Sequence, residues 1–291
     1  MELRAGELSL GLAPEIGGSV TYFRAGNVNL MRPLSAAARA QGDVLGVAMF
    51  PMTPYANRIA GNAFRFGGRI WRFEANNPPD RFNVHGNGWL SAWRAEIAGP
   101  TEASLGLDCL APSRPYRYRA TQQFVLSPEA LVVTTSVTNR GACAMPFGFG
   151  QHPWFERDRD VILKFEAPRF WLEGPDGVAT DVITTPPELD FSAGTLLPKG
   201  WRNNCYGEWR GLAEIIYPSR GIGLRVEGDP IFRNIMLYAD PDKPYFCLEP
   251  QTNAACAFNK WEEGRGEELG IIVLEPGASA SGEITFTPFR L

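Results

Sequence analysis

The sequence predicts an all-β protein built as an antiparallel sandwich, and three observations favour this fold class. Apolar and polar residues alternate with a period of two in short runs, as at Leu8, Leu10 and Leu12, which predicts strands with one buried face. Glycine and proline separate these runs at intervals of about ten residues, which is typical of hairpins and short loops. No amphipathic run of helical length and period stands out anywhere in the chain.

The first half of the chain contains a regular series of predicted strands. A tight hairpin is expected at residues 64–73, because Gly67 and Gly68 supply the positive φ that a two-residue turn requires. Residues 35–40 favour one short helical turn. Residues 50–59 contain too much proline for a central strand, so an ordered loop is expected there. The predicted strands of this half lie at residues 8–12, 19–23, 64–66, 69–73, 94–97, 103–109, 116–126 and 131–139.

The second half continues the same pattern to the carboxyl end. Its predicted strands lie at residues 161–165, 213–217, 222–226, 232–238, 245–249, 271–274 and 284–287. This series is too long for an immunoglobulin-size domain of about 100 residues, so either two sandwiches lie side by side or one very large sandwich forms. Since no linker or composition shift marks a boundary, we expect one domain over residues 1–291.

Composition and charge restrict the class of partner. The chain has 291 residues, is 44% hydrophobic and carries a formal net charge of −4, with lysine and arginine scattered along it. This distribution argues against a nucleic-acid surface and favours a neutral or small partner. The amino-terminal residues lack the apolar core of a signal peptide, and no stretch approaches the ~20 apolar residues of a membrane span. We therefore expect a cytoplasmic protein without a nucleic-acid or membrane partner.

The cysteines do not indicate a metal or redox site. The five cysteines are an odd and widely spaced set, and no Cys-x-x-Cys or paired His-x-x-x-His motif occurs. Free thiols in a reducing compartment are the expected state. A zinc site and a cysteine nucleophile both lack the partner residues they need, so we expect no metal.

One of only two histidines lies in a stiff local frame near the middle of the chain. His152 is followed by Pro153, which restricts its backbone to β or polyproline geometry. Gly148 and Gly150 allow a ligand or another segment to approach closely. This frame favours a functional imidazole, and a structural histidine at a strand end is the alternative.

Three further polar groups lie in constrained local frames: Arg58, His85 and Glu249. Glu249 ends an apolar strand and precedes a proline. A carboxylate buried there without a partner would cost free energy, so it is expected to have a partner or a task. The structural alternatives are a glutamate that caps a strand, an arginine that pairs with loop carbonyls, and a turn histidine.

Taken together, these segments resemble the aldose 1-epimerase, or galactose mutarotase, family. The matching segments occur in the family's order and at family-like spacing over nearly the whole chain: PYANRI at 54–59, FGG at 66–68, Asn77 before HG at 85–86, GQHPWF at 150–155, and FCLEPQT at 246–252 with Asn259 after it. The resemblance implies one large β-supersandwich of galactose mutarotase-like fold with an open cleft. It further implies that the protein interconverts the α and β anomers of a free monosaccharide without a cofactor.

The same resemblance implies residue roles. His152 falls on the general acid and Glu249 on the general base. The implied substrate-binding positions are Asn57, Arg58, His85 and Asn203. Asn203 departs from the pattern of those family members that have a substrate-contacting aspartate at this position. Because an amide both donates and accepts hydrogen bonds whereas a carboxylate only accepts them, the substrate preference is left open.

The chemistry explains why these residue types are needed. A base must take the proton of the C1 hydroxyl while an acid protonates the ring oxygen, and ring closure on the other face reverses both roles. A carboxylate beside an imidazole is expected to raise the imidazole's pKa and hold it cationic. Arg58 and His85 are then expected to donate hydrogen bonds to hydroxyls and to developing charge on oxygen.

Three other functions are kept open. A glycosidase needs two carboxyl groups about 5–9.5 Å apart, and Glu249 has no second acid in a comparable frame. A hexose-phosphate epimerase needs extra cations around the cleft, for which Arg58, Arg81 and Arg94 are the candidates. A non-catalytic sugar-binding protein on the same scaffold is the third. The sequence does not distinguish a monomer from a homodimer.

Overall fold

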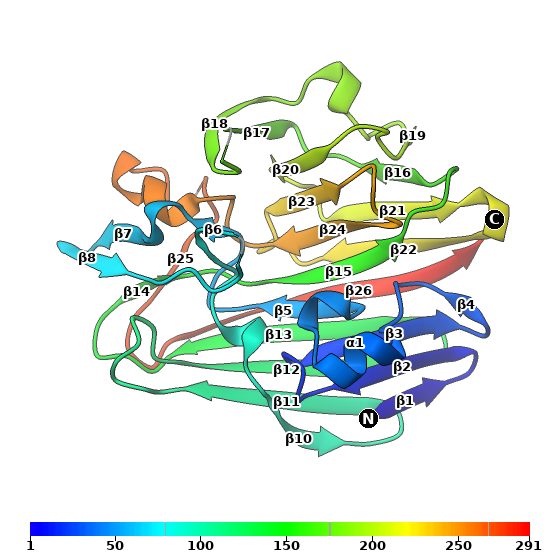
Figure 1. Ribbon diagram of the computed structural model, residues 1–291, viewed down its shortest axis with the longest axis horizontal. Coiled ribbons are helices and arrows are strands. Elements are labelled where there is room, and N and C mark those ends of the chain that lie inside the picture. The colour runs from blue at the N-terminus through cyan, green and yellow to red at the C-terminus, as the bar shows by residue number, and fades with distance from the viewer. Residues whose placement is uncertain (79, 175, 267) are drawn as a thin grey trace.

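Two large antiparallel β-sheets packed against each other make up most of the computed structural model, which describes residues 1–78, 80–174, 176–266 and 268–291 (Figure 1). Within these residues, eleven strands form the first sheet and nine form the second, and three further two-stranded pairs lie outside them. The predicted all-β class is therefore confirmed.

The first sheet carries the functional residues discussed below. Its strand order is β1-β2-β3-β5-β15-β24-β23-β20-β17-β18, and β4 pairs with β3. Its strands are β1 (Glu2–Ala5), β2 (Leu8–Ala13), β3 (Ser19–Ala25), β4 (Val28–Asn29), β5 (Met49–Met52), β15 (Gly150–Glu156), β17 (Arg169–Glu173), β18 (Ala179–Thr184), β20 (Arg202–Gly207), β23 (Asn234–Ala239) and β24 (Tyr245–Gln251).

The second sheet covers one face of the first. Its strand order is β10-β11-β12-β13-β26-β22-β21-β16-β19. Its strands are β10 (Arg94–Ala98), β11 (Glu102–Cys109), β12 (Tyr118–Leu126), β13 (Leu131–Asn139), β16 (Ile162–Phe165), β19 (Thr195–Leu196), β21 (Leu212–Tyr217), β22 (Ile222–Gly228) and β26 (Ser279–Arg290).

Short elements decorate the ends of the sheets. The predicted hairpin and helical turn are both found, as β7–β8 and α1; β7 lies beside η6 at one end of the molecule (Figure 1). Among the described helical segments, none is long and apolar enough to cross a membrane. These elements are α1 (Ala36–Gln41), η1 (Val44–Gly46), η2 (Ala60–Asn62), η3 (Gly88–Leu90), η4 (Pro187–Leu189), η5 (Pro218–Arg220), η6 (Ala257–Glu263), β6 (Arg58–Ile59), β7 (Ala63–Phe66), β8 (Arg69–Arg72), β9 (Asn83–Val84), β14 (Met145–Phe147) and β25 (Ile272–Leu274).

The two faces of the first sheet have different roles. Successive side chains of a strand point to opposite faces, and on β24 Phe246 and Leu248 enter the main core together with residues of the second sheet. The alternate residue Cys247 joins a second apolar cluster that also contains Phe50 and Trp154. The face turned away from the second sheet is therefore also packed, and it is the face that carries Glu249. The main core includes residues of both sheets, which supports the single domain, still a prediction.

The expectation of a loop at residues 50–59 is wrong at both ends, because Met49–Met52 forms β5 inside the first sheet and Arg58–Ile59 forms β6. β3 pairs with β5 only at Met49, so beyond that residue β5 has one partner strand, β15. A strand with one unpaired side tolerates Pro51, since it does not need every backbone donor. Residues 54–57 form the expected loop.

Two asparagine side chains tie this loop region to the segment after β24. The buried Asn253 accepts a hydrogen bond from the Ala56 amide at 3.0 Å and donates one to the Ala56 carbonyl at 2.9 Å. Asn259 accepts from the Ala60 amide at 2.8 Å and donates to the Ala60 carbonyl at 2.9 Å. Each amide thus bonds the backbone as a neighbouring strand would, and both hold residues 56–60 in place.

These anchors give a test of stability. Asn253→Ala is expected to lower the free energy of unfolding by about 2–4 kcal/mol, because it leaves buried backbone groups of Ala56 without partners. Asn259→Ala is the matched control, and it is expected to cost only about 0.5–1.5 kcal/mol, since water reaches this exposed residue. Urea unfolding of both variants measures the difference. Equal losses would contradict the assignment of Asn253 as a buried anchor.

Candidate active site

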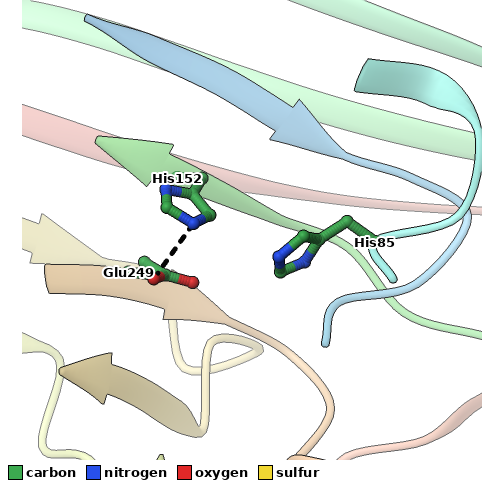
Figure 2. A group of neighbouring side chains, drawn as sticks. All are labelled: His85, His152 and Glu249. Carbon is green, nitrogen blue, oxygen red and sulfur yellow. Dashed lines mark ion pairs between the residues drawn. The ribbon is translucent and has the colours of Figure 1, made fainter. Parts of the chain in front are cut away.

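A histidine and a glutamate face each other across the middle of the first sheet. β15 and β24 are adjacent, and their register places His152 opposite Glu249. His152 Nε2 lies 3.2 Å from Glu249 Oε1, as the dashed line in Figure 2 shows. Only 7% of His152 and 2% of Glu249 is exposed. We call these two residues the His152–Glu249 pair.

Aromatic rings fix the orientation of His152. Phe50 stacks on the imidazole with ring centroids 4.4 Å apart, and Trp154 stacks on it at 4.8 Å. The guanidinium of Arg32 lies over the Trp154 ring at 4.4 Å and donates hydrogen bonds to the carbonyls of residues 45 and 47. The imidazole is thus held by stacking, and its ring edge is directed at Glu249.

Burial sets the charge of the pair. Burial raises the pKa of Glu249 to about 8, partly offset by the nearby positive charge of Arg58. Burial also lowers the pKa of His152 to about 3, and the charge of Arg32 lowers it further. The sequence-based expectation of a raised imidazole pKa is therefore wrong. The carboxylate is present at ion-pair distance, but the loss of water around both groups outweighs its attraction.

His85 is the third polar group of the cluster. It follows β9, and its ring points towards Glu249 and lies perpendicular to that of His152, with centroids 5.3 Å apart (Figure 2). The backbone amide of Asn57 donates a hydrogen bond to His85 Nδ1 at 3.0 Å, and the backbone amide of His85 donates to the Asn57 carbonyl at 2.9 Å. Since Nδ1 accepts, the proton of the neutral ring is on Nε2. Burial and the charge of Arg58 lower the pKa of His85 well below its usual value.

Arg58 and Asn57 complete the loop side of the cluster. Arg58 is in β6, which pairs with β9, so it is placed beside the residues that lead to His85. Its guanidinium makes an ion pair with Asp80 at 2.8 Å and is partly exposed. Asn57 has a positive φ of 64°, a conformation that asparagine adopts more readily than most residues. Its side chain accepts a hydrogen bond from the Arg58 amide and donates to the sulfur of Met236.

The arrangement of the cluster fits poorly with a metal. Possible ligand atoms of His85, His152 and Glu249 lie within 4.8 Å of one another. A metal needs an unprotonated nitrogen, but His85 Nε2 carries the ring proton because Nδ1 accepts the Asn57 amide. These three groups are therefore better suited to proton transfer and hydrogen bonding than to coordination.

Asn203 lies on the same face of the first sheet as Glu249, in the neighbouring row of paired residues. The register aligns Asn203 with Tyr238 on β23 and Cys247 on β24, beside Trp154 on β15. The amide of Asn203 donates a hydrogen bond to Glu173 at the end of β17. Three of the other four predicted site residues thus lie around the pair, and Asn203 stands two strand spacings from β24, or about 10 Å.

A separate cavity of about 720 Å³ lies beside the loops that carry the cluster. It shares Pro54 and Gly86 with those loops but is not lined by His85, His152 or Glu249. Its amide Asn76 already donates to two backbone carbonyls. The cavity does not include the buried histidines and carboxyl whose pKa values are shifted, so the cluster is the better candidate for an active site.

Comparison with known proteins identifies the family. The sequence profile of the aldose 1-epimerase family matches residues 2–287. The chain belongs to the aldose 1-epimerase family.

Relatives of this aldose 1-epimerase family member extend over its whole length. It is 34% identical over 291 residues to the uncharacterised protein YphB of Escherichia coli K12, an alignment that covers 97% of this chain and 96% of that protein. A crystal structure of a candidate aldose 1-epimerase from Escherichia coli K12 superposes with a TM-score of 0.91 at 32% identity and covers 100% of this chain and 98% of that one. A galactose mutarotase-like protein of Clostridium acetobutylicum gives a TM-score of 0.87 at 19% identity, with coverage of 100% and 95%, and shows the same fold. The predicted galactose mutarotase-like fold is confirmed.

Several residues of this face were not predicted from the sequence. Trp154 lies in the GQHPWF segment described above, so the contact of its ring with His152 could be foreseen. Phe50 also stacks on His152, but the sequence predicts a loop there. Glu173 precedes Gly174 and Trp201 follows Gly200, so each has a glycine beside it, but neither belongs to a segment that resembles the family. Only strand pairing brings these residues to the same face as Asn203.

The tautomer of His85 can be measured directly. In ¹⁵N-labelled protein we expect its Nδ1 to be unprotonated, its Nε2 to be protonated, and both to stay unchanged from pH 8 to about pH 5.5, because burial lowers its pKa. Long-range ¹H–¹⁵N correlation spectra report this state. Since the chain has only two histidines, the His152→Asn variant assigns the signals. Titration of His85 near pH 6.5, or a proton on Nδ1, would contradict the proposed hydrogen bond.

Proposed function

We propose that this protein is an aldose 1-epimerase that interconverts the anomers of a neutral, free monosaccharide, with His152 as general acid and Glu249 as general base. The 3.2 Å contact between His152 Nε2 and Glu249 Oε1 on a dry sheet face carries this proposal. An acid and a base this close can serve two oxygens bonded to one carbon. The C1 hydroxyl and the ring oxygen of a pyranose are such a pair.

The two pKa shifts suit the reaction because they keep one transferable proton on the pair. Removing that proton is opposed until the pH exceeds the Glu249 pKa of about 8. Adding a second proton is opposed until the pH falls towards the His152 pKa of about 3. Between these limits the proton is either on the carboxyl or on the imidazole, and the pair has no net charge. Acid–base catalysis needs one transferable proton on the pair at every stage of the cycle.

Ring opening uses the form with the proton on His152. A bound sugar presents its C1 hydroxyl to Glu249, and a hydrogen bond to the carboxylate favours the ionised form, so the proton moves to the imidazole. Glu249 then takes the hydroxyl proton while His152 Nε2 protonates the ring oxygen, and the C1–O bond of the ring breaks. The products are an open-chain aldehyde, a protonated carboxyl and a neutral imidazole, which is the uncharged state that burial favours.

Ring closure on the other face reverses these roles. After rotation about the C1–C2 bond, His152 takes the proton of the attacking hydroxyl, and Glu249 returns its proton to the aldehyde oxygen. Each group ends in its starting state. The neutral His85, with its proton on Nε2, acts in both halves as a hydrogen-bond donor that does not change charge.

The cations proposed for a phosphorylated sugar are already paired with carboxylates. Arg94 is on β10 in the second sheet, where it pairs with Asp108 at 2.7 Å. Arg81 pairs with Asp176, and Arg58 pairs with Asp80 at 2.8 Å. The three arginines therefore do not form an anion site, which supports a neutral substrate.

Replacing either member of the pair tests the roles. Glu249→Gln and His152→Asn are each expected to lower kcat by about 10²–10⁴-fold, because each removes a positioned acid or base. Polarimetry on freshly dissolved α-galactose, α-glucose, arabinose and glucose 6-phosphate gives the rates above the spontaneous reaction. Glu166→Gln, at an exposed and distant position, is the control. Near-normal rates in a folded variant would contradict its role, and an inactive wild type would favour a binding protein.

The pH dependence of the rate tests the shared proton. We expect kcat/KM to be level from pH 5 to about 7.5 and to fall above the Glu249 pKa of about 8. The fall should approach roughly tenfold per pH unit, because the pair then loses its only transferable proton. The rate without protein must be subtracted at each pH, since acids and bases also catalyse the spontaneous reaction. A decline below about pH 6.5, where an ordinary imidazole titrates, would contradict the shared proton.

A further inference from the structure

A second carboxylate lies on the same sheet face as the His152–Glu249 pair. β17 pairs with β20 in a register that, continued by three residues, sets Glu173 opposite Asn203. Asn203 in turn is aligned with Tyr238, in the row next to that of Glu249. Alternate residues of a strand share a face, so Glu173 stands at the far end of the surface that begins at His152.

Ring contacts confirm that this surface is continuous. Trp154 stacks on His152 at 4.8 Å, Tyr238 lies edge-on to Trp154 at 6.2 Å, and Trp201 lies edge-on to Tyr238 at 5.5 Å. Trp201 is 51% exposed, which is unusual for so large an apolar side chain. The row of rings ends next to Asn203, and its exposed member, Trp201, offers a flat apolar face of the kind that packs on the C–H surface of a sugar ring.

The surroundings of Glu173 leave it free to accept further hydrogen bonds. Its hydrogen-bond partners are the amide of Asn203 and the indole of Trp201, which occupy two of the roughly four acceptor positions of a carboxylate. The side chain is only partly buried. Glu173 and the Arg58 guanidinium both lie close to Gly177. A Cβ atom added to this glycine would lie 3.4 Å from Glu173 Oε1 and 3.6 Å from Arg58 Cζ. Glu173 thus stands between the loop that carries Arg58 and the strand that carries Asn203.

We infer that Glu173 is a specificity-determining residue, whose carboxylate, oriented by the Asn203 amide, accepts a hydrogen bond from a sugar hydroxyl remote from the anomeric carbon. This inference rests on the proposed function. It also explains how the chain functions with an amide at position 203. An aspartate at position 203 would supply a hydrogen-bond acceptor. Here Glu173 supplies it from β17, the strand that pairs with β20.

The inference also defines the substrate class. A carboxylate at this end of the surface repels a phosphate or carboxylate on the substrate, and Arg58, the nearby cation, is already paired with Asp80. The site therefore selects neutral aldoses with a free hydroxyl at the position that Glu173 contacts, and it discriminates against phosphorylated and acidic sugars.

The first experiment compares wild type and Glu173→Gln on glucose, galactose and their 2-, 3-, 4- and 6-deoxy forms. The variant is expected to lose on the order of ten- to hundredfold in kcat/KM with the parent sugars, the value of a hydrogen bond to a charged group. The loss should be mainly in KM, because a contact remote from C1 is made in the ground state as well as in the transition state. With the one deoxy sugar that lacks the contacted hydroxyl, wild type and variant should have the same kcat/KM.

A second experiment exchanges the two groups. Asn203→Asp alone places two carboxylates side by side and is expected to be impaired like Glu173→Gln. The double variant E173Q/N203D restores one carboxylate bonded to one amide, and it is expected to recover at least tenfold of the loss. Glu166→Gln is the control for removal of a negative charge elsewhere, and thermal unfolding monitored by circular dichroism checks that each variant is folded.

The outcomes separate this inference from the proposed function. An active wild type with a hydroxyl-dependent loss in Glu173→Gln, and recovery in the exchange variant, supports it. A folded Glu173→Gln variant that keeps its kcat/KM, or that loses the same factor with every deoxy sugar, overturns it and leaves the proposed function intact. A wild type that accelerates no sugar overturns the proposed function and this inference with it.

Discussion

The chemistry of this protein depends on one constraint, which is that a carboxyl and an imidazole face each other where water hardly reaches them. In water, a glutamate and a histidine at this distance would be a simple ion pair. On the dry face of β15 and β24, separated charge is costly, so burial raises the pKa of Glu249 and lowers that of His152. The consequence is a pair that holds one proton over a wide pH range. In the protein alone this proton is on the carboxyl, and its transfer to the imidazole is costly until a substrate hydroxyl stabilises the carboxylate.

Most of the surrounding structure serves to keep that pair dry and in register. Phe50 and Trp154 both stack on the imidazole, and this stacking orients the ring. The segment that bears Arg58 is held by amide anchors on the segment after β24, the strand that carries Glu249. The local conformation is equally constrained, since Asn57 and His85 both have a positive φ. Such conformations are retained only where the surroundings determine them.

The sequence predicted those parts of the site that are local. His152, Glu249, His85 and Arg58 each lie in a short frame of glycine, proline and aromatic residues, and such frames are visible without a fold. The contacts that form only when strands pair were not visible in the sequence. β20 is polar and lacks alternation, so neither it nor its pairing with β17 could be foreseen. The direction of the His152 pKa shift was missed for a related reason, because burial depends on every chain segment that covers the ring.

In the role inferred for Glu173, the sheet presents a carboxylate to the substrate from the strand beside the one that carries Asn203. Across two paired strands, opposite side chains on one face are neighbours, so either can present a carboxylate to the same ligand atom. A second carboxylate at position 203 would then be harmful, because two like charges side by side raise each other's pKa. An amide at 203 instead donates to Glu173 and stabilises its charge. On this inference, the amide of Asn203 and the carboxylate of Glu173 act together, and the role of each depends on the other.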